Sequence, residues 1–200
     1  MNYNGPKVRL SRKLGIQMTP KAGKVMQKKN YPPGAHGNGR RRGKISDYGK
    51  QLMEKQRLRL QYNISENHMR KAYKDATSMT GNTGELLVQV LESRLDAFVY
   101  RAGFAPTIYA ARQFVSHSHF LVNGKKMNIP SYKVKLSDVI SVKEKSRTKL
   151  IFQDAMRNAS SPEYIELSKT DFSAKLAYIP ARSEVPVECE VPLVVEYYSR

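Results

Sequence analysis

The chain has 200 residues, enough for one large domain or two small ones, and 40% of them are hydrophobic. Its formal net charge of +18 is too large for a solubility device, because so many like charges repel one another unless an anionic partner neutralises them. The sequence has no run of about 18 apolar residues, which argues against a membrane as that partner, and its single cysteine excludes an intrachain disulfide. These properties predict a cytoplasmic protein that binds nucleic acid.

The positive charge is concentrated towards the N-terminus. Residues 1–50 contain thirteen Lys or Arg and one acidic residue. Residues 151–200 contain five Lys or Arg and eight acidic residues. We therefore expect the first quarter to contact phosphate and the last quarter to face solvent or a protein.

Residues 1–45 are predicted to form an extended basic arm. They are rich in Gly, Pro and cations and show no sustained apolar period, so they cannot bury enough surface to order themselves unaided. The alternative to phosphate contact is a solvated charge run. The candidate RNA contacts in the arm are Arg9, Arg12, Lys13, Arg40, Arg41, Arg42 and Lys44.

Residues 46–92 are predicted to form a helical lobe. Ser46 is a good N-cap for a helix that ends near Gln61, and a second helix begins at Ser65 and ends before Gly81. A broad apolar stripe then predicts one continuous helix from Thr83 to Gly103. Candidate RNA contacts on the first helix are Tyr48, Lys50, Lys55, Arg57 and Arg59.

Residues 93–150 are predicted to form a compact module. Thr107 caps a short helix, and Asn123-Gly124 between two strand-like runs is a strong hairpin signal, because both central residues of a type I′ turn need positive φ. Further strands are expected at 132–136 and 139–142.

Residues 151–200 are expected to begin with a short helix that ends near Asn158. Strands are predicted at 164–167, 175–178 and 193–197, and the proline-containing stretch 186–192 is typical of an edge or loop.

Cationic and amide side chains are dense on the helix pair and hairpin of the module. Structured RNA is recognised largely by its shape and backbone, so rigid elements that carry such groups suit it. We expect Ala replacement of Arg94, Arg101 and Arg112 to weaken RNA binding without loss of the fold. His117 and His119 have no third metal ligand nearby, so we expect them to form hydrogen bonds with RNA or the backbone rather than to bind a metal. The alternative is that they lie in a simple exposed loop. The candidates are Arg94, Arg101, Arg112, His117, His119, Asn123, Lys125 and Lys126.

Several strings resemble a known family. In the module these are Arg94-Leu95-Asp96, Tyr100-Arg101-Ala102-Gly103-Phe104-Ala105, Ala111-Arg112-Gln113, Leu121-Val122-Asn123-Gly124-Lys125 and Asn128-Ile129-Pro130-Ser131. Outside it they include Pro33-Gly34-Ala35-His36-Gly37, Ser46-Asp47-Tyr48-Gly49 and Val195-Glu196-Tyr197-Tyr198-Ser199. The chain resembles the bacterial family of the fourth protein of the small ribosomal subunit, after which the RNA-binding module is named.

The resemblance implies an α+β fold, with a mostly helical lobe, an extended arm and an inserted α/β module of two helices on a short, mainly antiparallel sheet. Residues 151–200 would return to the helical lobe. It further implies direct binding of small-subunit ribosomal RNA that nucleates assembly of the subunit body. Contact with small-subunit protein five, influence on decoding accuracy and proximity to messenger RNA are also implied, and no homo-oligomer is expected.

Some members of the family hold zinc with cysteines in the arm. Here residues 25–36 contain no cysteine and a single histidine, so no metal or other cofactor is expected.

Two other classes are weighed against the ribosomal interpretation. Arg94-Leu95-Asp96 mimics the aspartate motif of pseudouridine synthases that carry the same module, but the chain has no separate catalytic domain, nucleophile elbow or phosphate loop, so no enzyme is expected. The second alternative is a regulator that binds RNA away from the ribosome, for example the messenger RNA that encodes it.

Overall fold

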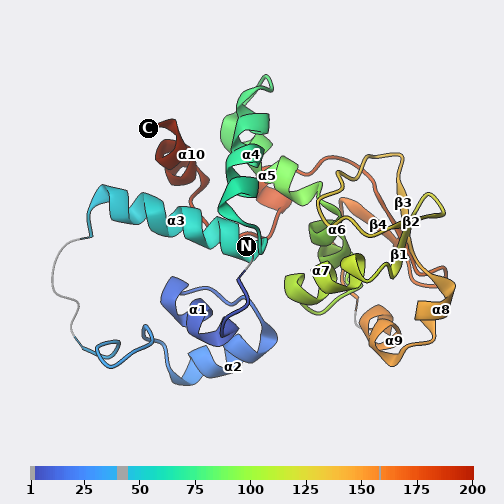
Figure 1. The fold of residues 1–200 in the computed structure, drawn as a ribbon, viewed down its shortest axis with the longest axis horizontal. Helices are drawn as coiled ribbons and strands as arrows, with labels where there is room; N and C mark the ends of the chain where they lie inside the picture. Colours follow the sequence, from blue (N-terminus) through green and yellow to red (C-terminus); the bar gives the residue numbers. More distant parts are fainter. Residues whose placement is uncertain (1–2, 40–44, 158) are drawn as a thin grey trace. The chain divides into compact units, whose positions relative to one another are not determined.

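The computed structural model describes residues 3–39, 45–157 and 159–200, and its class is α+β (Figure 1). The chain forms two compact units. The first consists of Met1–Gly84 together with Pro186–Arg200, and the second of Glu85–Val185. In the described residues, all strands belong to the second unit, and no helix combines the length and apolar character needed to cross a bilayer.

The first unit is built from helices. Ser46 and Ser65 cap the two longest of them, because each hydroxyl accepts a hydrogen bond from the backbone N–H three residues later. The helices are α1 (Lys7–Leu14), α2 (Pro20–Lys28), α3 (Asp47–Gln61), α4 (Glu66–Thr77) and α10 (Val191–Ser199).

Residues 7–28 form two helices and are not an extended arm. Gly15 ends α1 in the left-handed region at φ 73°, and Thr19 caps α2. The expectation of an extended arm was wrong because it counted only the apolar surface that the arm could bury against itself. In the structure the arm also packs against Leu60 of α3. The buried side chains of this cluster are Leu10, Leu14, Ile16, Met18 and Leu60.

The strand expected at 193–197 is also wrong, because this segment lies within α10. Val and Tyr favour strands, but that preference yields when packing rewards another conformation. Val191 and Val194 are buried at helical spacing, Pro192 suits the first turn, and α10 packs against α3.

The second unit places helices on one five-stranded antiparallel sheet, in the order β2-β1-β3-β5-β4. Its helices are α5 (Thr83–Glu92), which begins in the first unit, α6 (Leu95–Arg101), α7 (Ile108–Ser116), α8 (Glu144–Arg147) and α9 (Leu150–Arg157). Its strands are β1 (Phe120–Val122), β2 (Lys125–Met127), β3 (Val139–Val142), β4 (Ile165–Ser168) and β5 (Ser173–Leu176). A 3-10 turn, η1 (Arg182–Glu184), follows them.

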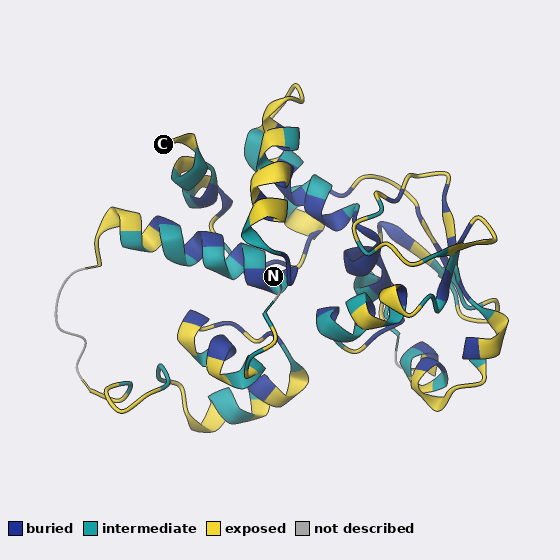
Figure 2. Cartoon of the chain, viewed as in Figure 1, coloured by how far each residue is buried: buried dark blue, intermediate teal, exposed yellow. Residues whose placement is uncertain are grey.

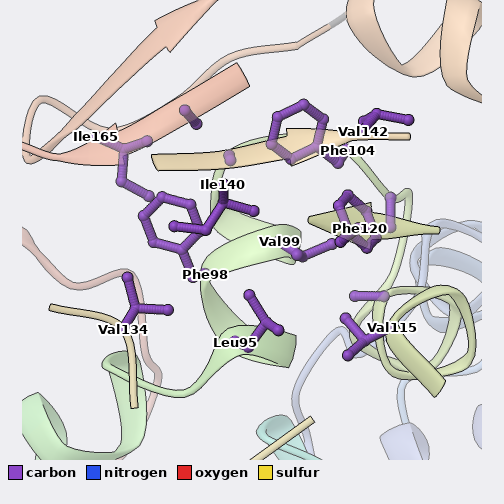
Figure 3. Close-up of a cluster of buried hydrophobic side chains, with 14 of the residues drawn as sticks. Leu95, Phe98, Val99, Phe104, Val115, Phe120, Val134, Ile140, Val142 and Ile165 are labelled. Atoms are coloured by element: carbon purple, nitrogen blue, oxygen red, sulfur yellow. The ribbon is translucent and has the colours of Figure 1, made fainter. Parts of the chain in front are cut away.

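The core of the second unit lies between α6, α7 and one face of the sheet. Figure 3 shows Phe98 and Val99 of α6 directed towards strand residues such as Phe120 and Ile140. Figure 2 shows α6 mainly in the colour of buried residues. The apolar stripe predicted for this segment is therefore core.

The single helix predicted from Thr83 to Gly103 is broken in the structure. Arg94 is extended, with φ −70° and ψ 141°, and it forms an isolated antiparallel bridge with Lys133. Val134 donates its N–H to the carbonyl of Ser93 at 2.7 Å, so the segment predicted as a strand at 132–136 contributes only this bridge. The apolar spacing continues across the break, so the pattern could not reveal it.

The domain borders also differ from those expected. Residues 151–185 belong to the second unit, because β4 and β5 extend its sheet beside β3, and only 186–200 return to the helical unit. The two compact units divide at residue 84, within α5, eight residues before the border expected at residue 92. The strands near 165 and 174 are offset slightly from their predicted positions, and α8 was not predicted.

We expect Leu14→Ala to lower the free energy of unfolding by about 2–5 kcal/mol, because it opens a cavity in the small cluster that joins α1 to α3. Urea denaturation measures the change, and hydrogen exchange should show faster exchange across α1. Leu150→Ala is the control, since Leu150 is 74% exposed, and it should change stability by less than about 0.5 kcal/mol. Equal exchange in α1 of Leu14→Ala and the parent would contradict this packing.

Candidate nucleic-acid interface

The β1–β2 hairpin has the turn that the sequence predicts. Asn123 and Gly124 both have positive φ, at 50° and 76°, as a type I′ turn requires. Lys125 and Lys126 follow on β2, an edge strand, and both are exposed. Figure 2 shows the hairpin tip in the colour of exposed residues. The hairpin therefore presents two cations next to a rigid turn.

The side chain of Asn123 fixes this hairpin from within the protein. Its Nδ2 donates to Asp138 Oδ1 at 2.8 Å, and its Oδ1 accepts from the Val139 N–H at 2.9 Å. The buried Asp138 also accepts from the Tyr132 hydroxyl and the Lys135 N–H, each at 3.0 Å. Asn123 thus positions the lysines, a role that its place in the hairpin motif did not indicate.

Burial by itself raises the pKa of Asp138, but hydrogen bonds from the Lys135 backbone, Asn123 and Tyr132 outweigh it. The pKa of Asp138 is therefore below its ordinary value of 3.8. Burial, together with the hydrogen bond to Asp138, raises the pKa of Tyr132. The network is held together by an ionised carboxylate.

A second carboxylate, Asp96, lies at the start of α6 and is buried. Arg94 binds it with two bonds, Nε to Oδ1 at 3.0 Å and Nη2 to Oδ2 at 2.7 Å. Arg112 of α7 donates Nη1 to Oδ2 at 3.0 Å, and the Ala97 N–H donates to Oδ1. Only 1% of the Asp96 side chain is exposed, so the carboxylate joins two arginines from different segments in a dry environment.

Glu92 at the end of α5 forms a similar pair with Arg101 of α6. Arg101 Nε and Nη2 lie 3.0 and 2.8 Å from Glu92 Oε1. The hydroxyl of Tyr164 donates to Oε2 at 3.5 Å, and burial together with Glu92 raises the pKa of Tyr164. The pair ties α5 to α6 across the break between them.

The three arginines of the module that were predicted as RNA contacts therefore differ in exposure. The side chain of Arg94 is 9% exposed, that of Arg101 13% and that of Arg112 25%. Arg94 and Arg101 bind buried carboxylates, which makes loss of stability the expected consequence of their removal. The available signal was an acidic residue close in sequence, Asp96 for Arg94 and Glu92 for Arg101.

The two histidines lie in different surroundings. His119 Nδ1 is 2.9 Å from the Ser146 hydroxyl, and its ring packs edge-on against Phe114 and Phe152. Burial lowers the pKa of His119, and nearby Lys149 contributes in the same direction. His117 is exposed. No group of three or more metal-ligating side chains gathers in the part of the chain that the structure describes.

On α3, the predicted contact Lys55 is buried. Its Nζ donates to Glu66 Oε2 at 3.0 Å and lies 4.8 Å from the centre of the Tyr197 ring. The Tyr198 hydroxyl donates to Glu66 Oε1 at 2.8 Å. Burial by itself raises the pKa of Glu66, but the hydrogen bonds from Lys55 and Tyr198 outweigh it and lower the pKa. Lys55 therefore joins α3, α4 and α10.

The other predicted contacts on α3 are partly engaged. Arg57 binds Glu54 and the Leu14 carbonyl, and Arg59 binds Gln56 and the Ile64 carbonyl. Lys50 is exposed and pairs with Asp47, and the exposed ring of Tyr48 lies 5.8 Å from that of Tyr197. These residues keep some exposed surface, unlike Lys55.

In the first thirty residues, Arg9 and Lys13 are exposed on α1, whereas Arg12 is half-buried. The Arg12 guanidinium lies 4.7 Å from the centre of the Tyr31 ring. The predicted contacts Arg40, Arg41, Arg42 and Lys44 lie outside the described residues.

Lys135, which the sequence reasoning did not single out, is exposed in the loop that Asp138 anchors beside the hairpin. Its backbone N–H helps to hold the carboxylate, so the side chain projects from a fixed position. The signal was the alternation in Tyr132-Lys133-Val134-Lys135, which was interpreted only as a strand.

Comparison with known proteins gives two family models, which divide at residue 92, the border expected from the sequence. A family model described as "Ribosomal protein S4/S9 N-terminal domain" matches residues 2–92, and one described as "S4 domain" matches residues 93–140. Relatives named "Small ribosomal subunit protein uS4" match nearly the whole chain. That of Streptomyces griseus is 48% identical over 204 residues, covering 100% of this chain and 99% of its own length. That of Brevibacillus brevis is 47% identical over 199 residues, covering 99% and 98%.

We expect Asp96→Asn to lower the free energy of unfolding by about 3–5 kcal/mol, because it leaves the buried Arg94 without its carboxylate. Asp154→Asn is the matched control. Its carboxylate is 66% exposed and lies 3.9 Å from Arg157, so the change should stay below about 1 kcal/mol. Urea denaturation measures both, and equal losses would show that the Asp96 cluster does not stabilise the fold.

We expect the stabilising effect of Asp138 on the hairpin to be lost in acid. Its folded pKa is depressed, so its contribution to stability is present above about pH 4 and is lost as the pH falls through the folded pKa. The stability difference between the parent and Asp138→Asn should therefore shrink as the solution is acidified below about pH 4. The titration of the Asp138 carboxyl carbon by NMR checks the premise, and a midpoint above 3.8 would contradict it.

Proposed function

Because the chain belongs to the uS4 family of small ribosomal subunit proteins, we propose that it binds the RNA of that subunit directly and serves as one of its structural constituents. The observation that carries the proposal is the hairpin. It presents exposed Lys125 and Lys126 on a turn held by the Asn123–Asp138 bonds. The proposal thus names a preorganised cationic element as the RNA-binding surface.

The physical argument concerns rigidity and charge. Contacts to the RNA backbone supply most of the electrostatic affinity and fix the orientation of the protein. A cation on a fixed hairpin loses little conformational freedom on binding, in contrast to one on a flexible tail. Within the described residues, Lys125 and Lys126 also give up no ion pair with a carboxylate when they meet a phosphate, whereas Lys50 gives up only its exposed pair with Asp47.

This argument separates the most exposed and the most buried of the predicted RNA contacts into two groups. We propose direct contact for the exposed cations Arg9, Lys13, Lys50, Lys125 and Lys126, and for the exposed part of Arg112. Arg94, Arg101 and Lys55 support these surfaces from within. The run from Arg40 to Lys44 stays in the proposal on its charge. The others stay proposed contacts outside both groups, namely Arg12, Tyr48, Arg57, Arg59, His117, His119 and Asn123.

The finer roles are also proposed from the family resemblance. They are nucleation of subunit assembly, contact with small-subunit protein five, influence on decoding accuracy and proximity to messenger RNA. The acidic balance of residues 151–200 supports a protein-facing surface there. A cytoplasmic location follows from the proposed place in the ribosome.

Co-sedimentation tests the ribosomal role against an RNA-binding role elsewhere in the cell. The chain, expressed with a small tag, should travel with small subunits at physiological salt. If most of it remained free of subunits while still binding RNA, a regulator outside the ribosome would be the better conclusion.

Salt dependence tests the electrostatic contact. If about six to ten phosphates are neutralised, affinity for small-subunit RNA should fall by roughly a thousandfold or more between about 50 and 200 mM salt. The double variant Lys125→Ala, Lys126→Ala should reduce the slope of log affinity against log salt by about 1.5–2. Arg157→Ala, which removes an exposed cation near Asp154, is the control and should leave the slope unchanged. Equal slopes in both variants would exclude the hairpin lysines from phosphate contact.

A further inference from the structure

The first unit contains a cleft of about 330 Å³, and four of the predicted RNA contacts, Arg12, Lys13, Lys50 and Arg57, contribute to its lining. It is lined by the end of α1, by α2 and the segment that follows it, by α3 between Gly49 and Arg57, and by the start of α10. Its volume lies at the lower end of the range of about 300–1,000 Å³ in which proteins hold small ligands. It can therefore receive one small group rather than a length of double helix.

The lining combines apolar side chains with cations. Met26, Met53 and Leu193 are half-buried and give the cleft an apolar surface. Five cations line it as well, namely Arg12, Lys13, Lys29, Lys50 and Arg57. An apolar surface surrounded by positive charge suits a ligand with a flat apolar body and an anionic group.

The acidic side chains of the lining do not cancel this charge. They are Glu54 and Glu190, against five cations. Glu54 is buried, and it accepts hydrogen bonds from Arg57 and from the Glu190 N–H. The exposed lysines Lys13 and Lys29 remain available for an anion at the mouth.

One wall carries a planar pair. The Arg12 guanidinium lies over the Tyr31 ring, and two hydrogen bonds fix it there, from Nε to the Tyr31 carbonyl at 3.1 Å and from Nη2 to the Pro32 carbonyl at 3.4 Å. Aromatic rings and guanidinium planes are the surfaces on which proteins stack unpaired RNA bases. The pair is preorganised, because hydrogen bonds to the Tyr31 and Pro32 carbonyls already hold the guanidinium in place.

We propose that this cleft binds one unstacked nucleotide of the RNA, with the base against the Tyr31–Arg12 pair and the methionines, and the phosphate at Lys13 and Lys29. This inference rests on the proposed function, since it names the single-stranded feature that the first unit recognises. An acidic peptide would also find the charge favourable, but it would make no use of the planar pair.

Fluorescence of a hairpin RNA that contains one bulged 2-aminopurine tests the proposal with the full chain. A second hairpin carries the same base paired within the stem. The chain should bind the bulged hairpin about tenfold more tightly than the paired one, and stacking in the cleft should quench its emission. Equal affinity for the two hairpins, with affinity for small-subunit RNA intact, would overturn the cleft proposal and leave the proposed function standing.

Variants of Tyr31 assign the preference to the cleft. Tyr31→Ala should abolish the preference for the bulge, and Tyr31→Phe should retain it because the ring remains. Tyr3→Ala is the matched control, since Tyr3 also lies beneath a cation, with Lys7 Nζ 4.9 Å from its ring centre, but does not line the cleft. Equal loss of preference in Tyr31→Ala and Tyr3→Ala would contradict the assignment.

Crosslinking of the unaltered chain gives a measurement that does not depend on how the variants fold. Small-subunit RNA substituted with 4-thiouridine should crosslink to peptides that contain Met26, Tyr31 or Met53. Crosslinks confined to the second unit would overturn the cleft proposal, and the absence of any binding to this RNA would overturn the proposed function itself.

Discussion

The carboxylate of Asp96 is the interaction on which the second unit depends. A chain with a net charge of +18 must keep its cations apart or pair them, and Asp96 holds two arginines from different segments. It does so where the chain leaves α5, bridges to Lys133 through Arg94 and begins α6. Breaking a buried pair leaves an uncompensated charge, so loss of Asp96 should destabilise all of these segments.

In the first unit, the carboxylate of Glu66 joins separate segments in the same way. This carboxylate accepts from Lys55 of α3 and Tyr198 of α10 while it lies on α4 itself. The Tyr198 ring also stacks on Tyr73, with their centres 5.1 Å apart. Residues separated by more than a hundred positions in the chain thus meet at one acidic group. In both units a carboxylate, buried at Asp96 and half-buried at Glu66, organises the basic residues that surround it.

Local signals predicted those parts of the fold that depend on local chemistry. The N-caps at Ser46, Ser65 and Thr107 and the turn at Asn123-Gly124 lie where the sequence placed them. Features that depend on distant partners could not be read in this way. The helices of residues 7–28 need Leu60, α10 needs α3, and the break at Arg94 is fixed by backbone bonds to residues 130–134.

The candidate site follows the same rule, because a motif gives the identity of a cation but not its exposure. Arg94 and Lys125 belong to the same RNA-binding module, yet one is bound to a buried carboxylate and the other projects from a hairpin. An arginine that leaves Asp96 for a phosphate exchanges one ion pair for another, whereas an exposed lysine gains a new one. Binding affinity should therefore arise mainly from the exposed cations, while the buried ones fix the positions at which those cations are held.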